Sequence, residues 1–217
     1  MGGGGWRSLP EWPPPGAAVQ RWHLHAGGTL ATSAPAEGAP GRYTYDPADP
    51  TPAVGGPGSL HAGPRDNRAL ESRPDVLTYT SAPLTRPLVI AGPVTAELFT
   101  GSSRPHTDFF ARLCDVDPGG PSVNVSDGIL RLDAATEAPQ RVRVELWPVA
   151  HQFRAGHRIR LQVSSGAHPR YARNPGSGEP LATATTLHAA RQSVHHDPAH
   201  PSAILLPVES RAGQPPW

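Results

Sequence analysis

Proline and glycine interrupt this chain so often that long helices are excluded. The 217 residues include 28 Pro and 23 Gly, and the apolar runs between them are short. Such punctuation favours short strands joined by turns and ordered loops. The length suits one large all-β domain or two small domains. A hydrophobic content of 37% is enough for one sandwich core.

Alternation of apolar and polar residues marks the strands. The clearest case is RVRVELW at Arg141–Trp147, which has the strict period of two of a half-buried strand. The same kind of pattern predicts further strands at Val19–Ala26, Val76–Thr80, Leu88–Phe99, Asp108–Val116, Arg158–Ser164 and Ala203–Val208. About eight strands without βα alternation predict an all-β fold, a jelly-roll (galactose-binding-like) β-sandwich with long ordered loops. Thr183–Ser193 is the one helix candidate.

The chain divides into an extended arm, residues 1–18, and a sandwich, residues 19–217. The arm is rich in Gly, Pro and Trp and has no periodicity. Its two tryptophans, Trp6 and Trp12, are costly to leave in water, so the arm is expected to dock on a surface. Residues 46–75 form a long connection, which in compact domains is usually ordered or functional.

Charge and cysteine content exclude several classes of protein. A net charge of +1 gives no electrostatic argument for nucleic acid or an anionic membrane. The single cysteine, Cys114, excludes an internal disulfide and lies in an apolar strand pattern, so we expect a buried, inert thiol. No apolar run is long enough to span a membrane, and the N-terminus lacks a signal-peptide pattern. We therefore expect a soluble cytoplasmic protein.

Charged side chains favour structural roles. Asp108 and Asp127 are expected at strand boundaries, where Asp satisfies backbone donors in turns. The sign of the charge alternates along the end of the long connection, which could join that loop to the sandwich edge through charge-assisted hydrogen bonds; the residues are Asp66, Arg68, Glu71, Arg73 and Asp75.

Histidine is abundant but does not define a site. His195, His196, Asp197 and His200 form the densest cluster, and a solvated loop is the favoured interpretation, with loose metal binding as the alternative. His23 and His25 share a strand face, and a catalytic base would need a nucleophile within reach. We expect these two to be structural. The sequence indicates no resident metal and no cofactor.

A catalytic nucleophile is not recognisable. A serine elbow needs small residues on both sides of the serine. Ser103 and Ser122 have only the upstream glycine, and Ser126 and Ser164 have only the downstream one. P-loop, dinucleotide-binding and HExxH signatures are missing too. We therefore assign no catalytic residue.

Several strings occur in an order that resembles one family. They are YDPADPTPAVGG (45–56), DNRALESRPDVLTYTSAPL (66–84), GPVTAEL (92–98), TDFFARLCDVDPGG (107–120), SDGILR (126–131), FRAGHRIRLQVSSGAHPRYARNPGSG (153–178) and HHDPAHPSAILLPV (195–208). The series resembles the C-terminal domain of the CocE/NonD (cocaine esterase/X-Pro dipeptidyl-peptidase) serine hydrolases. SSGAHPRYARN departs from the family, which more usually has an aromatic residue near His168.

The resemblance implies a non-catalytic module that is inactive alone. Family members combine an α/β-hydrolase domain bearing a Ser-Asp-His triad, a helical cap and this sandwich. The resemblance therefore implies the hydrolase domain as partner, which is in cis in the family and is expected here in trans or lost. Leu98 and Phe99 match an apolar edge that helps to line the acyl pocket, with an ordinary core pair as the rival explanation. An exposed docking face would also favour self-association. The alternative function is a carbohydrate- or ligand-binding module, in which Trp147 would be a test residue.

Overall fold

Eleven strands dominate the described part of the chain. The computed structural model describes residues 8–9, 11–57 and 62–209. The strands are β1 (Ala17–His25), β2 (Thr29–Ala31), β3 (Gly41–Tyr45), β4 (Leu77–Ser81), β5 (Leu88–Ser102), β6 (Thr107–Val116), β7 (Ser122–Leu132), β8 (Gln140–Phe153), β9 (Arg158–Ser164), β10 (Ala190–His195) and β11 (Ala203–Glu209). One short helix, α1 (Arg68–Glu71), and a 3-10 turn, Ala26–Gly28, are the helical elements of these residues. No described helix has the length and apolar character needed to cross a membrane.

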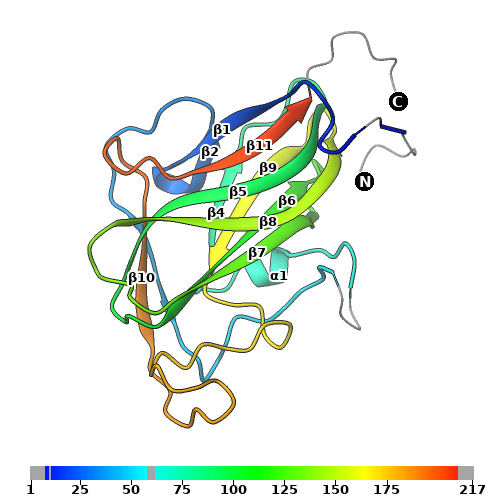
Figure 1. The fold of residues 1–217 in the computed structure, drawn as a ribbon. Helices are drawn as coiled ribbons and strands as arrows, with labels where there is room; N and C mark the ends of the chain where they lie inside the picture. The colour runs from blue at the N-terminus through cyan, green and yellow to red at the C-terminus, as the bar shows by residue number, and fades with distance from the viewer. Residues whose placement is uncertain (1–7, 10, 58–61, 210–217) are drawn as a thin grey trace.

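The strands form one continuous sheet that folds over to enclose a core. Its order is β3-β10-β5-β11-β1-β2-β4-β9-β6-β7, and β8 pairs with β5. The strand ladders are antiparallel except for the parallel pair β2–β4. Figure 1 shows β1, β11, β5 and β8 as a layer in front of β4, β9 and β6. The predicted all-β sandwich is therefore confirmed, whereas the finer jelly-roll assignment stays a prediction.

Alternating side chains of both layers fill the core. On β8 the residues Val142, Val144 and Leu146 point inward and are buried, as the period of two in RVRVELW predicts. They meet Leu113 and Leu161 of the opposite layer in one hydrophobic cluster. Burying apolar area at about 25 cal/mol per Å² makes this cluster the main stabilising contribution to the fold.

The expected helix at Thr183–Ser193 is wrong. The segment runs as a loop and then enters β10 at Ala190. Gln192 pairs with Tyr43 of β3 on one side and with Ser102 of β5 on the other. Pairing of β10 with β3 on one side and with β5 on the other outweighs the weak amphipathic spacing of this segment. Strands β2, β3 and β7 were also missing from the prediction.

The sequence predicted that Asp108 and Asp127 lie at strand boundaries and accept from backbone donors in turns. Asp108 is the second residue of β6 but accepts from side chains, and Asp127 lies inside β7, so the turn role is wrong for both. Both lie within strands and are almost completely buried. Arg131 donates two hydrogen bonds to Asp108, at 2.8 and 2.6 Å. Asp127 accepts from Arg112 at 3.0 Å and from Arg170 at 2.8 and 2.6 Å. Loop segments cover this side of β6 and β7, so charged residues are buried there as ion pairs.

Polar contacts join the long connection, residues 46–75, to the sheet. Glu71 accepts from Ser122 of β7 at 2.6 Å and from Gln162 of β9 at 2.7 Å. Asp66 accepts from the backbone N–H of Ser122 at 3.1 Å. Arg73 donates to Asp75 at 2.7 Å within the loop. The predicted attachment of this loop by charge-assisted hydrogen bonds is confirmed.

The described end of the arm packs on the sheet at a glycine. Gly92 of β5 has a φ of 137°, and a β-carbon there would lie 3.2 Å from the Cβ of Pro207 and 3.3 Å from the Cβ of Pro13. The lack of a side chain therefore lets Pro13 approach the sheet closely. Trp12 is 50% exposed. Trp6 lies outside the described residues.

Candidate functional site

One face of the front layer is the candidate functional surface. The side chains of Leu24, Leu98, Val144 and Ile204 from β1, β5, β8 and β11 all point into the core. Alternate residues of these four strands therefore lie on the opposite side, which we call the outer face. It carries Val19, Arg21 and His23 on β1; Leu205 and Pro207 on β11; Thr95, Glu97 and Phe99 on β5; and Arg141, Arg143, Glu145 and Trp147 on β8.

A buried carboxylate lies at the centre of the outer face. Glu97 is 4% exposed although it lies on the surface of the sheet, because Arg21 (2.6 Å) and Arg141 cover it and pair with its two oxygens. Burial alone raises the pKa of Glu97, but the hydrogen bonds from Arg141 and Arg21 outweigh it and lower the pKa below its usual value. The sequence did not suggest this site, since its partners are 76 and 44 residues away in the chain.

The structure separates the two residues that the resemblance assigns to a pocket edge. Leu98 is fully buried and belongs to the core of this domain. Phe99 is half-buried on the outer face, where its ring packs edge-on against His200 with 5.5 Å between ring centroids. The backbone N–H of Phe99 donates to Ser202 Oγ at 2.8 Å. Phe99 is therefore the member of the pair that a neighbouring domain could contact.

Other apolar side chains on and beside the outer face are largely exposed. Val19 is 70% exposed and Trp147 is 61% exposed. Trp12 of the arm is 50% exposed, and the segment 13–16 connects it to the start of β1. These three side chains are the exposed apolar surface that another protein domain could cover here.

The histidine cluster divides into two parts. His196 is buried and packs edge-on against Tyr79, with 5.9 Å between the ring centroids. His195, Asp197 and His200 are half-buried, and one ligand atom from each lies within 4.8 Å of the others. The structure therefore brings three of the four clustered residues together.

No ordered Ser-His-Asp chain exists among the described residues. The four serines considered above bond to other groups: Ser103 accepts from the Arg191 backbone, and Ser122, Ser126 and Ser164 donate to Glu71, the carbonyl of Trp147 and the carbonyl of Gly166. Ser193 does hydrogen-bond to His195, at 3.2 Å. However, Asp197 bonds to His200 instead of His195. The carboxylate that would orient the histidine beside a serine nucleophile is therefore not bonded to His195.

The remaining two side chains considered from the sequence are those of His23 and Cys114. Burial lowers the pKa of His23, with Arg21 adding to the effect, and no described serine, threonine or cysteine side chain bonds to its ring. Cys114 is fully buried, and burial raises the pKa of its thiol to about 12. A thiol with that pKa is inert at neutral pH, as predicted.

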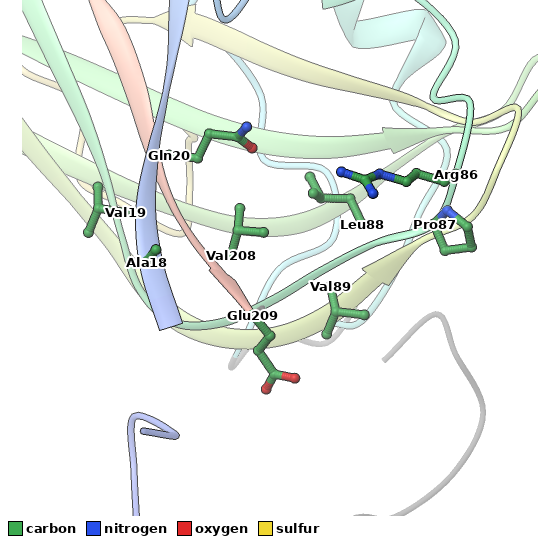
Figure 2. Close-up of a pocket in the computed structure, with 9 residues that line it drawn as sticks. All are labelled: Ala18, Val19, Gln20, Arg86, Pro87, Leu88, Val89, Val208 and Glu209. Atoms are coloured by element: carbon green, nitrogen blue, oxygen red, sulfur yellow. The ribbon is translucent and has the colours of Figure 1, made fainter. Parts of the chain in front are cut away.

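A surface depression of about 400 Å³ lies where the start of β1, the start of β5 and the end of β11 meet, at the end of the front layer away from Phe99. Figure 2 shows its lining, which consists of Ala18, Val19, Gln20, Arg86, Pro87, Leu88, Val89, Val208 and Glu209. Leu88 and Phe99 are eleven residues apart on β5, which corresponds to roughly 36 Å along a strand. The depression is therefore separate from the Phe99 region.

The fold and the side-chain arrangement define a β-sandwich domain that carries no recognisable catalytic machinery in its described residues. Residues 1–205 match the family model of the X-Pro dipeptidyl-peptidase C-terminal non-catalytic domain, and the chain belongs to this family. It is a domain of the CocE/NonD hydrolase type, as the ordered strings predicted.

Individual relatives agree with this assignment. The chain is 37% identical to cocaine esterase from Rhodococcus sp. (strain MB1 Bresler) over 235 residues, which cover 97% of this chain and 41% of that protein. An α-amino acid ester hydrolase structure matches with a TM-score of 0.78 and 31% identity, over 88% of this chain and 36% of that one. An aminopeptidase from the marine sediment archaeon Thaumarchaeota archaeon matches with a TM-score of 0.82 and 29% identity, over 95% and 39%. The chain thus spans about two fifths of the length of these relatives.

Proposed function

We propose that this domain packs through its outer face on an α/β-hydrolase domain and contributes Phe99 to the edge of the acyl pocket. The observation that carries the proposal is the match of nearly the whole chain to only 41% of an esterase. The domain would complete an acyl or peptidyl serine hydrolase without supplying its nucleophile. The hydrolase domain could be present in cis or in trans.

The geometry around Phe99 supports a contact role. Leu98 anchors the strand in the core, and Ser202 holds the backbone of Phe99 from the neighbouring loop. The ring of Phe99 is therefore presented from a rigid strand, as a pocket-lining residue must be. Val19 and Trp147 add exposed apolar area to the same face. Covering this area with another domain is favourable because it removes apolar surface from water.

The first experiment tests whether the chain is catalytic by itself. We expect the isolated chain neither to react with a fluorophosphonate probe nor to hydrolyse an activated ester such as p-nitrophenyl butyrate above the buffer rate. A heat-denatured sample provides the background for both assays. Active-site labelling together with turnover would contradict the non-catalytic assignment.

The second experiment tests the role of the outer face. The matching part of the Rhodococcus cocaine esterase would be replaced by this chain, and benzoyl and acetyl ester hydrolysis would be measured. In this chimaera we expect Phe99→Ala to lower kcat/KM for the benzoyl ester by at least about tenfold, and for the acetyl ester by less, because an apolar pocket loses about 1–3 kcal/mol per contact group removed. Val123→Ala on β7, the last strand of the sheet order and seven places from β5, is the control. Equal effects of the two variants would refute the proposed edge.

A further inference from the structure

The loop that joins β10 to β11 gathers three side chains of the types that bind transition metals. His195 ends β10, and Asp197 and His200 lie in the loop that follows. One ligand atom from each lies within 4.8 Å of the others, and all three side chains are half-buried. We propose that His195, Asp197 and His200 form a binding site for one borderline transition-metal dication of the Zn²⁺ class. The site does not depend on the function proposed above.

The spacing within the cluster fits metal coordination. The Nδ1 atom of His200 lies 3.1 Å from Oδ2 of Asp197. Two adjacent ligands with metal bonds of about 2.0–2.1 Å are separated by roughly 3.0–3.4 Å. One ligand atom of His195 lies within 4.8 Å of those of Asp197 and His200, so its ring must move toward them to share one coordination sphere.

The ligand types select the class of cation. Two imidazoles and one carboxylate suit Zn²⁺, Ni²⁺, Co²⁺ or Cu²⁺, whereas Ca²⁺ and Mg²⁺ prefer all-oxygen sites.

The loop is already ordered around these ligands. Oδ1 of Asp197 accepts from the backbone N–H groups of Ala199, at 2.9 Å, and His200, at 3.0 Å. Ser202 Oγ donates to the carbonyl oxygen of His195 and accepts from the N–H of Phe99. These contacts fix the Asp197 carboxylate and the backbone of His195 before binding, so the His195 ring is the ligand that must adjust when a cation binds.

The position of the site links it to the outer face. His195 is paired with Phe99 in the β10–β5 ladder, and the ring of His200 packs on that of Phe99. A cation bound here would hold the two imidazoles and restrict the ring of Phe99. The metal site would therefore rigidify the part of the outer face where Phe99 is presented.

Titration calorimetry of the full chain, stripped with a chelator, tests the proposal with ZnCl₂ and NiCl₂ in a non-coordinating buffer. We expect one saturable equivalent of Zn²⁺. His200→Gln and Asp197→Asn should each weaken binding by more than about tenfold, since loss of even an outer-sphere partner costs about 10–100-fold. His168→Gln removes an exposed histidine outside the cluster and should leave the affinity unchanged.

Asp197→Asn keeps the test decisive if His200→Gln fails to fold. An asparagine oxygen can accept from the same two backbone N–H groups, so the loop is retained while the charged ligand is lost. Circular dichroism and the thermal midpoint check that this variant is folded. Absence of a one-equivalent isotherm in the wild-type chain, or wild-type affinity in folded Asp197→Asn, would overturn the metal site.

Discussion

Removing the carboxylate of Asp127 should destabilise this domain more than any surface charge substitution. Asp127 is 1% exposed and receives hydrogen bonds from Arg112 and Arg170. Arg112 is itself 0% exposed. It also donates to Asn67 at 2.7 Å and to the carbonyl of Val54 at 2.5 Å, both in the long connection. Asp127→Ala therefore leaves a buried guanidinium without its counterion and weakens the attachment of that loop.

The size of the effect follows from the burial. Breaking a buried ion pair by removing one partner costs about 3–5 kcal/mol, because the remaining charge is uncompensated. The whole free energy of unfolding of a domain is about 5–15 kcal/mol. For a domain of this length, 1 kcal/mol corresponds to about 2–4 °C in the melting temperature. We therefore expect the melting temperature of Asp127→Ala to fall by about 6–20 °C.

Urea unfolding at 25 °C and calorimetric melting would measure the loss. Glu137→Ala is the control, because its pair with Arg191 is exposed, with side-chain exposures of 72% and 78%, and its loss should not change the midpoint measurably. The double variant Arg112→Met/Asp127→Leu should recover part of the loss, since it removes the fully buried Arg112 charge and leaves only the less buried Arg170 without Asp127. A destabilisation by Asp127→Ala of less than about 1 kcal/mol would refute the reasoning, because it would mean that water reaches Arg112.

The remaining predictions concern a thiol, an acid-sensitive network and a surface aromatic. Cys114 should react with iodoacetamide only in denaturant, since burial raises its pKa to about 12; modification of the native chain at neutral pH would contradict this. Burial raises the pKa of Asp115, but hydrogen bonds from His151 and His157 outweigh it and lower the pKa overall. The ionised Asp115 therefore stabilises the fold above about pH 4, and this stabilisation is lost as the pH falls. Asp115→Asn should flatten the pH dependence of the urea midpoint between about pH 5 and 3. An unchanged pH dependence in this range would count against the contribution of Asp115 and its two histidines. Trp147→Ala should leave a glycan-array profile unchanged, whereas loss of specific glycan binding would favour the carbohydrate-binding alternative.

Much of the strand pattern was predictable because it is local. Arg158–Ser164 has the bounds predicted for it, and Ala203–Val208 differs from β11 by one residue. These segments alternate between an apolar core side and a polar side, which a sequence displays directly. Thr183–Ser193 misled the prediction because a strand buried between two others owes its conformation to those neighbours.

The candidate surface was predictable only in part. Phe99 came from the family resemblance, but its separation from Leu98 required the observed direction of each side chain. Glu97 and its two arginines gave no signal, since the three residues come from β1, β5 and β8. The same applies to His195, Asp197 and His200, for which the sequence showed proximity in the chain but not which rings face each other.

The sequence by itself determined the all-β class, the family and the lack of a serine elbow, because strand periodicity and ordered motifs are properties of neighbouring residues. Only the tertiary structure decided which charges are buried as pairs, which side of the sheet remains uncovered, and which histidines meet. Those properties arise from contacts between strands that are distant in the chain, and their energies depend on burial, which no local pattern records.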